Sequence, residues 1–307
     1  MINIELARRP VSLRAGDKIA ICSPAGRIAP EKVEKAVAVL REQGWEPVVM
    51  PHALGEHGTF SGSAAERLSD LRSAFADPEV RAILCSRGGY GVVHIMKDVD
   101  ALPTVAADPK WVIGFSDISA LHALMSHKGI ESIHASMAAH ILEGADNEDN
   151  AALFGILRGE RPAYTFAGTA DDRPGMAEGI LLGGNLAVLA ELISTPYDII
   201  SPDTVLFIED IAEPVYKIER ILYQLRLSGV LGRLRGLVVG QFTDYKPDEN
   251  HPGGMEGMIR DAVADYDFPV AFNAPIGHVF HNIPLIESAR VTLKVNAEGV
   301  NSLIFWR

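Results

Sequence analysis

Short apolar runs alternate with amphipathic helical patterns through the first half of the chain, and few folds accommodate that alternation. The apolar runs have the length of strands and lie at residues 18–22, 46–50, 80–85, 111–114 and 132–134. Helical periodicity is present at residues 30–40, 63–76 and 118–126. Repeated strand, turn and helix segments predict βαβ units around a parallel sheet. In such a sheet, ligands bind at the carboxyl ends of the strands.

The pattern changes near residue 160, where polar segments replace the alternation. Residues 144–150 are polar and acidic. We expect loops at residues 159–162 and 171–175, and a boundary between domains of residues 1–160 and 161–307. Helical patterns follow at residues 184–193 and 214–227, and the second has proline at its start and glycine past its end. Strand patterns lie at residues 205–208, 237–241, 270–272, 290–295 and 302–306, with a hairpin-like turn at 296–299.

The charge balance and the apolar content exclude several classes of protein. Lys and Arg number 28 against 40 Asp and Glu, so the net charge is −12. No net positive field exists to gather phosphates, so we expect neither a nucleic-acid nor a membrane partner. The chain has no apolar stretch of membrane-spanning length, and its first residues lack the apolar region of a secretory signal. We predict a soluble, cytoplasmic protein whose cysteines, Cys22 and Cys85, are buried free thiols.

A serine follows the apolar run 111–114 at the start of a helical pattern, in Gly114-Phe115-Ser116-Asp117. A strand-to-helix turn of this kind exposes a serine hydroxyl, and the N–H of Asp117 near the helix start can bind an oxyanion. Ile118 stands where the full nucleophile motif has a second glycine. The alternative is a polar residue that only caps the helix.

Three glycines follow the run 80–85, in Arg87-Gly88-Gly89-Tyr90-Gly91. Glycines let backbone N–H groups approach an anion closely. The dinucleotide fingerprint lacks its last glycine here, because His94 stands at that position. We therefore favour a turn that binds an oxyanion or a carboxylate over a nucleotide loop. A tight turn without a ligand is the alternative.

Two further segments in the second half contain groups capable of acid–base chemistry. Glu209 and Asp210 close the strand pattern 205–208, where a carboxylate can orient a histidine or cap the next helix. His278 and His281 lie in a turn-like segment, but no carboxylate or cysteine has a supporting metal-ligand spacing. The alternative to a catalytic histidine here is a structural one. We expect no metal and no cofactor. Asn185, after two glycines, either caps a helix or reaches a ligand.

Taken in order along the chain, these segments resemble the LD-carboxypeptidase family of serine peptidases, which includes the microcin C immunity peptidases. The motifs that carry the resemblance are IAICSPAG from Ile19, SRGGYG from Ser86, GFSD from Gly114, GGNL from Gly183, LFIED from Leu206, YKIER from Tyr216, QL from Gln224, and Gly277-His278. Each motif alone is weak, but the ordered set is specific and covers nearly the whole chain. One departure follows the histidine, where Pro284-Leu285-Ile286-Glu287 replaces the usual Pro-Leu-Gly of the family.

The resemblance implies a parallel-sheet α/β domain, a smaller β-rich C-terminal domain, and a catalytic triad of Ser116, Glu209 and His278. It also implies hydrolysis of the bond between an L-centre diamino acid and the terminal D-Ala of a murein tetrapeptide, in cell-wall recycling, and a homodimer. The backbone N–H groups of Gly89 and Asp117 are then the expected oxyanion hole.

The small peptide substrate is expected to be bound by Arg87, Tyr90 and Asn185, with Arg87 closest to the terminal carboxylate or, alternatively, in a structural salt bridge. The other functions left open are a family member acting on a peptidyl-nucleotide antibiotic, a muropeptide-binding protein without catalysis, and a nucleotide-dependent enzyme.

Overall fold

The computed structural model describes residues 7–141, 144–247 and 253–306, and the chain divides into two compact units. The N-terminal unit runs to Arg161 and includes Ile283–Ile286 from much later in the chain. The C-terminal unit comprises Pro162–Asn282 and the segment from Glu287 onward. No helix among the described residues has the length and apolarity needed to span a membrane.

The N-terminal unit contains a six-stranded sheet in the order β11-β5-β4-β3-β1-β2. Strands β1 to β5 pair in parallel, as the alternating pattern predicts. Their bounds are Lys18–Cys22, Glu46–Val49, Val80–Cys85, Trp111–Gly114 and Ser132–His134, and the edge strand β11 is Leu285–Glu287. The near-continuous burial of β3, β4 and β5 is typical of a sheet covered on its faces.

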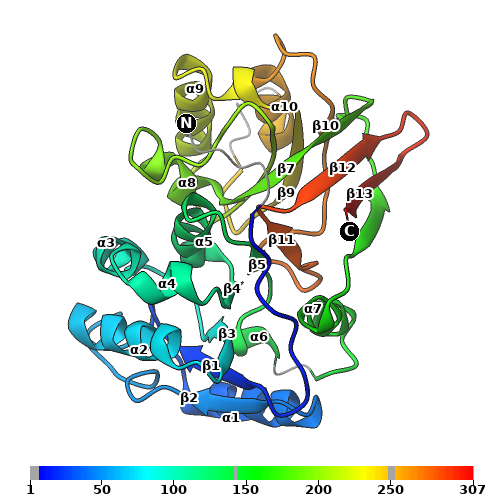
Figure 1. Cartoon of the computed structure of the whole chain (residues 1–307). Helices are drawn as coiled ribbons and strands as arrows, with labels where there is room; N and C mark the ends of the chain where they lie inside the picture. The colour runs from blue at the N-terminus through cyan, green and yellow to red at the C-terminus, as the bar shows by residue number, and fades with distance from the viewer. Residues whose placement is uncertain (1–6, 142–143, 248–252, 307) are drawn as a thin grey trace. The chain divides into compact units, whose positions relative to one another are not determined.

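Helices α1 and α2 lie beside this sheet in Figure 1 and have clear start signals in the sequence. Helix α1 (Pro30–Glu42) has proline at its first position. Helix α2 (Ala64–Ala76) begins with a capping box between Ser63 and Glu66. The remaining helices of the unit are α3 (Met96–Asp100), α4 (Pro103–Ala107), α5 (Ser119–His127), α6 (Ala138–Ile141) and α7 (Glu148–Arg158).

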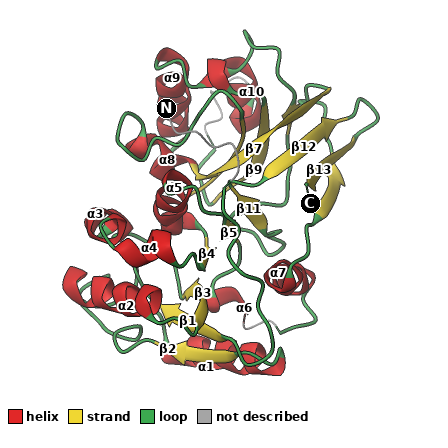
Figure 2. Cartoon of the chain, viewed as in Figure 1, coloured by secondary structure: helices red, strands yellow, loops and turns green. Residues whose placement is uncertain are grey.

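The C-terminal unit contains a seven-stranded mixed sheet in the order β10-β9-β8-β7-β12-β13-β6. Strands β7 to β10 pair in parallel, whereas β7, β12, β13 and β6 pair antiparallel. The strand bounds are β6 Ala163–Ala167, β7 Gly175–Asn185, β8 Thr204–Ile211, β9 Gly236–Thr243, β10 Val270–Ala271, β12 Arg290–Val295 and β13 Val300–Phe305. Helices α8 (Leu186–Leu192), α9 (Val215–Leu227) and α10 (Gly254–Ala262) complete the unit, as Figure 2 shows. The predicted α/β class is confirmed.

Several elements differ from the sequence prediction. Helix α7 begins inside the polar segment 144–150, for which no helix is predicted, because Asn147 caps its first turn and Leu153 and Phe154 are buried. Strand β7 was missed because its glycines look like chain breakers. A Cβ atom at Gly183 would lie 2.1 Å from the carbonyl oxygen of Phe207, so the neighbouring strand requires glycine there. Strand β6 and helix α10 were not expected either.

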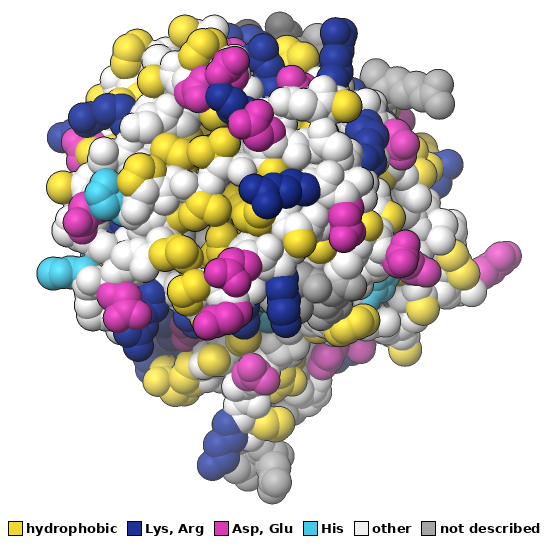
Figure 3. All heavy atoms as spheres, turned by 90° about the horizontal axis from the view of Figure 1, so that it is seen from below, with side chains coloured by type: hydrophobic (Ala, Val, Ile, Leu, Met, Phe, Trp, Pro, Cys, Tyr) yellow, Lys and Arg dark blue, Asp and Glu magenta, His cyan; other side chains and the backbone are white. Residues whose placement is uncertain are grey.

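The surface in Figure 3 carries acidic and basic side chains interspersed with each other. The net charge of −12 is therefore not gathered into one field on the face that this figure shows.

Candidate active site

Ser116 occupies a backbone conformation that serine seldom adopts. It follows strand β4 at the start of a short 3-10 helix, residues Ser116–Ile118, and its φ angle is 67°. Only glycine enters this left-handed region without cost. A Cβ atom at Gly114 would lie 2.9 Å from the side chain of Ile118, so glycine is needed two residues before the serine. Helix α5 has Ile118 at its N-cap position, which leaves the capping role proposed as the alternative for Ser116 without support.

The glycine turn after β3 packs directly against this serine. A Cβ atom at Gly88 would lie 2.8 Å from Cβ and 3.0 Å from Oγ of Ser116. The carbonyl of Gly88 accepts a hydrogen bond from the N–H of Gly26 at 3.1 Å. Gly89 and Gly91 have φ angles of 115° and 123°. The turn therefore brings glycine backbone to the candidate nucleophile, and its predicted role in binding an oxyanion or a carboxylate stays a prediction.

A buried arginine and a buried aspartate hold one peptide unit of this turn from both sides. The Arg67 guanidinium donates to the carbonyl of Gly91 at 2.9 Å, and also to the carbonyl of Pro24. The N–H of Val92, in the same peptide unit, donates to Oδ2 of Asp117 at 3.0 Å. Burial lowers the pKa of Arg67, and the Asp117 carboxylate opposes that effect. The geometry of the glycine turn is thus fixed by charged groups on α2 and on the serine turn.

Tyr90 belongs to an aromatic group beside the glycine turn. Its ring centroid lies 5.7 Å from that of Phe60 and 5.1 Å from that of His94, and its hydroxyl lies 3.1 Å from Nε2 of His94. Tyr90 is 57% exposed. Arg87 is also exposed, and its guanidinium donates to the carbonyl of Arg27 at 3.0 Å. Both side chains are accessible to a ligand.

Glu209 and His278 form a close pair within the C-terminal unit. Nδ1 of His278 lies 2.8 Å from Oε2 of Glu209, whose side chain is fully buried. A carboxylate only accepts hydrogen bonds, so Nδ1 carries the proton and Nε2 is left as the acceptor. Gly277 makes this approach possible, because a Cβ atom there would lie 2.9 Å from Oε2 of Glu209. His281 is exposed by comparison.

Glu209 lies within strand β8 rather than closing it, which corrects the sequence prediction. Asn185 of β7 is its partner on one side. On the other side, Ile208 pairs with Val239 and Asp210 with Phe242, so the residues between them, Gly240 and Gln241, lie opposite Glu209. A bulge of this kind changes the direction in which a side chain points. Here the bulge lies at Glu209, whose side chain contacts His278.

The side chains of Asn185 and Asp210 are engaged within the protein. Asn185 caps α8 by accepting from the N–H of Val188 at 3.2 Å, and its amide donates to Oδ1 of Asp210 at 2.9 Å. Burial raises the pKa of Asp210 to about 6. The expected capping role of Asn185 is therefore present, and its role in substrate binding stays a prediction.

The predicted site residues fall into two groups. Ser116, Asp117, Gly89, Arg87 and Tyr90 lie in the N-terminal unit, and Glu209, His278 and Asn185 lie in the C-terminal unit. The departure after the histidine, Pro284–Glu287, contains strand β11. No group of three or more potential metal-ligating side chains exists among the described residues. Sequence reasoning missed Arg67 and Phe60, for which a single sequence carries no signal.

Models of two protein domains match the chain. The model described as the LD-carboxypeptidase N-terminal domain matches residues 19–135, and the model of the LD-carboxypeptidase C-terminal domain matches residues 178–293. A putative carboxypeptidase of Streptomyces coelicolor is 36% identical over 88% of each chain. The murein tetrapeptide carboxypeptidase of Pseudomonas aeruginosa is 30% identical over 86% of this chain and 89% of its own.

Solved structures agree with these matches. The crystal structure of muramoyltetrapeptide carboxypeptidase from Oxalobacter formigenes superposes with a TM-score of 0.84 at 26% identity, covering 94% of this chain and 99% of that one. MccF in complex with glutamyl sulfamoyl guanosine also has a TM-score of 0.84, covering 98% and 99% of the two chains, but at 18% identity it shows the fold alone.

The fold and these matches define a peptidase of the carboxypeptidase class. More narrowly, the chain belongs to the LD-carboxypeptidase family.

Proposed function

We propose that this chain is a serine-type LD-carboxypeptidase that removes the terminal D-Ala from murein tetrapeptides. The left-handed backbone of Ser116, at φ 67°, is the observation that carries the proposal. A strained, half-buried serine between a parallel strand and a helix is typical of a nucleophile rather than of a cap. The relatives named for murein peptides supply the substrate class.

The proposed mechanism uses His278 as the base. Its Nδ1–H is held by Glu209 at 2.8 Å, so Nε2 takes the proton of the Ser116 hydroxyl as Oγ bonds to the peptide carbonyl carbon. The imidazolium then delivers that proton to the nitrogen of D-Ala as the amide bond breaks. Water hydrolyses the acyl-enzyme by the same proton route, and the free serine is regenerated.

The negative oxygen of each tetrahedral intermediate needs donors that are already oriented. We assign the backbone N–H groups of Gly89 and Asp117 to this role, each worth roughly 3 kcal/mol of transition-state stabilisation. The contact of Gly88 with Ser116 supports the assignment. Arg87 and Tyr90, exposed on the same turn, are proposed to bind the terminal carboxylate. The homodimer and the cytoplasmic location stay predictions.

Mass spectrometry of a murein tetrapeptide incubated with the protein tests the proposal. The expected product has lost one D-Ala, and the Ser116→Ala variant releases none. Release of a different fragment, or equal turnover by the variant, would contradict it. A parallel incubation with a peptidyl-nucleotide conjugate separates the alternative substrate, and binding of the tetrapeptide without turnover identifies a non-catalytic protein.

A further inference from the structure

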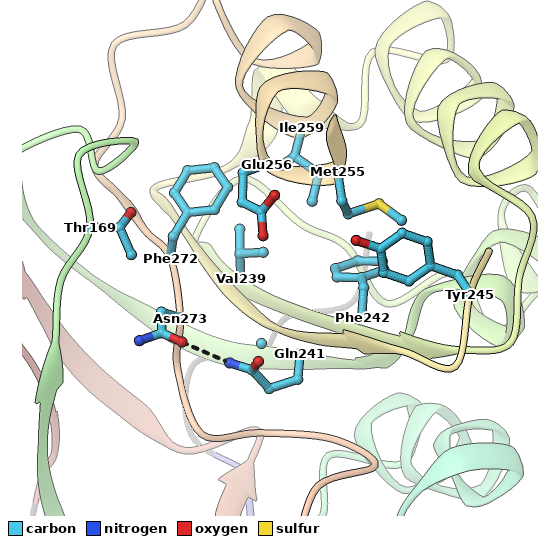
Figure 4. Close-up of a pocket in the computed structure, with 11 residues that line it drawn as sticks. Thr169, Val239, Gln241, Phe242, Tyr245, Met255, Glu256, Ile259, Phe272 and Asn273 are labelled. Atoms are coloured by element: carbon cyan, nitrogen blue, oxygen red, sulfur yellow. Dashed lines mark hydrogen bonds between the residues drawn. The ribbon is translucent and has the colours of Figure 1, made fainter. Parts of the chain in front are cut away.

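A pocket of about 120 Å³ lies within the C-terminal unit at the carboxyl end of strand β9 (Figure 4). Its walls come from the end of β9, the chain after β10, the first turns of α10 and the loop before β7. The polar side chains of the lining that matter here are those of Gln241, Tyr245, Glu256 and Asn273. None of the sequence motifs drew attention to it.

The polar groups of this pocket favour a cationic ligand. The Glu256 carboxylate and the Tyr245 hydroxyl both point into it in Figure 4, and no Lys, Arg or His belongs to the lining among the residues that the structure describes. Burial, with the charge of Glu256, raises the pKa of Tyr245, so its hydroxyl stays neutral. The Gln241 amide donates to Oδ1 of Asn273 at 3.2 Å and to the carbonyl of Ala274 at 3.0 Å, which fixes its position.

Apart from Thr169 and Gly240, the rest of the lining is apolar. Val239 and Phe272 are buried, and so are Met255 and Ile259 of α10. Aliphatic stems gain free energy on such surfaces while their charged ends reach polar groups. An ammonium group at the end of a short aliphatic chain matches both parts of the lining.

The pocket adjoins the Glu209–His278 pair through the sheet. Gln241, in its wall, lies opposite Glu209 across the bulge between β8 and β9. The N–H of Gln241 donates to the carbonyl of Ile276 at 2.9 Å, two residues before His278. A Cβ atom at Gly277 would lie 3.3 Å from the carbonyl oxygen of Gln241. The pocket wall and the turn that carries His278 are thus joined by a backbone hydrogen bond, which is the geometric basis for placing a side chain of a peptide bound beside His278 in this pocket.

We propose that this pocket binds the side-chain ammonium of the diamino acid whose carbonyl is attacked, with Glu256 as its counter-charge. This inference rests on the proposed function and deepens it, because it makes Glu256 a specificity-determining residue. The ammonium of lysine and that of diaminopimelic acid share this chemistry, and the two differ in the additional carboxylate of diaminopimelic acid.

Three tetrapeptides that differ only in the third residue test the inference: L-lysine, meso-diaminopimelic acid and L-norleucine. Of the lysine and diaminopimelate peptides, the wild type is expected to prefer one. For that peptide, we expect Glu256→Gln to raise KM roughly tenfold, and a tenfold change corresponds to about 1.4 kcal/mol. The kcat should change little, and turnover of the norleucine peptide should not change. The exposed Glu298, outside the pocket lining, provides the matched control as Glu298→Gln.

The outcomes separate the inference from the proposed function. Equal losses on all three peptides, or no loss on any, would overturn the pocket while leaving the carboxypeptidase intact. If no peptide is cleaved, the proposed function is wrong. Calorimetry then tests whether the pocket binds the side-chain ammonium. In that measurement, Kd of the lysine and diaminopimelate peptides for the Ser116→Ala variant is compared with and without Glu256→Gln. A tenfold weaker binding of either ammonium peptide supports the pocket, and an unchanged Kd for both rejects it.

Discussion

At the residue scale, the strained backbone conformation of Ser116 serves no capping role in the fold, so we ascribe it to catalysis. A left-handed conformation costs an L-residue about 1–2 kcal/mol relative to glycine. Neither the 3-10 turn nor helix α5 uses the Ser116 side chain as a cap. The conformation is therefore maintained by the surroundings, with Gly114 and Gly88 each leaving room for it.

Replacing Ser116 by alanine and by glycine should separate the contribution of the hydroxyl to catalysis from the cost of the backbone conformation to stability. Both variants lose the nucleophile, so kcat in the tetrapeptide assay should fall by several orders of magnitude. The glycine variant should be more stable than the alanine variant by roughly 1 kcal/mol, because φ 67° suits glycine. Chemical denaturation measures this difference, and turnover near the wild-type rate by either variant would refute the nucleophile.

His278 and His281 make a second residue-scale prediction, because they lie close together in sequence but differ in surroundings. His278 contacts the buried Glu209, whereas His281 is exposed. His278→Ala should lower kcat nearly as much as Ser116→Ala, and the double variant should be little worse, since members of a triad act as a unit. His281→Ala should cost about tenfold or less. If His281→Ala is inactive and His278→Ala is nearly as active as the wild type, the catalytic base is His281 and not His278.

At the element scale, helix α2 influences a turn from which the whole of strand β3 separates it in the chain. Arg67 reaches from α2 to the carbonyl of Gly91, and Asp117 accepts from the N–H of the same peptide unit. Gly89, an assigned oxyanion donor, lies two residues earlier in that turn. The orientation of its N–H thus depends on a helix that begins more than twenty positions before it.

Arg67→Met should reduce kcat by about 10–100-fold with little change in KM, because a misoriented donor is felt mainly in the transition state. The affinity for a boronate that forms a tetrahedral adduct should fall in parallel. Arg67→Lys retains one donor and should recover part of both losses. Because Arg67 is buried, unfolding is measured alongside. A variant that loses stability but keeps kcat and boronate affinity would show a structural role only.

The buried histidine of α5 predicts how stability depends on pH. Nε2 of His122 lies 2.9 Å from the carbonyl of Gly114, and Nδ1 lies 2.8 Å from the Ser132 hydroxyl. Burial lowers the pKa of His122 from 6.5 to about 4. Between these values the unfolded chain binds the extra proton, so the free energy of unfolding should fall on acidification by up to about 1.4 kcal/mol per pH unit.

Replacing the histidine checks this assignment. His122→Gln should flatten the dependence between pH 6.5 and about 4, whereas replacing the exposed His57 by glutamine should not. Urea denaturation at several pH values measures the slope. An unchanged slope in the His122 variant would assign the acid sensitivity to other groups.

At the scale of the whole molecule, each unit contributes different chemistry to the proposed reaction. The N-terminal unit holds the nucleophile and the glycine turn, and the C-terminal unit holds the carboxylate–histidine pair. All of the assigned steps use side chains and backbone N–H groups of this chain.

We therefore expect dialysis against a chelator to leave kcat and KM unchanged, because the proposed chemistry needs no Lewis acid. The assay compares dialysed protein with and without added Zn²⁺. Activity lost on dialysis and restored by zinc would contradict a purely serine-based mechanism.

The sequence predicted the parallel strands well and the long-range contacts poorly. Lys18–Cys22, Val80–Cys85 and Trp111–Gly114 match their predicted bounds, because continuous apolar runs are a local signal of buried strands. Strand β7 was missed because local reasoning cannot see the crowding by Phe207 that requires glycine. The Glu209–His278 contact joins residues far apart in sequence, so it was available only through the family resemblance.

Because Ile283–Ile286 belongs to the N-terminal unit, that unit is not one continuous stretch of sequence. The chain passes between the two units at more than one point, and β11 is the outer neighbour of β5 in the six-stranded sheet. A fragment that ends at Arg161 would leave the edge of β5 uncovered, and uncovered edges promote self-association. The two halves therefore cannot be exchanged between relatives as cassettes by a single crossover: a recombinant needs its β11 from the same parent as β5.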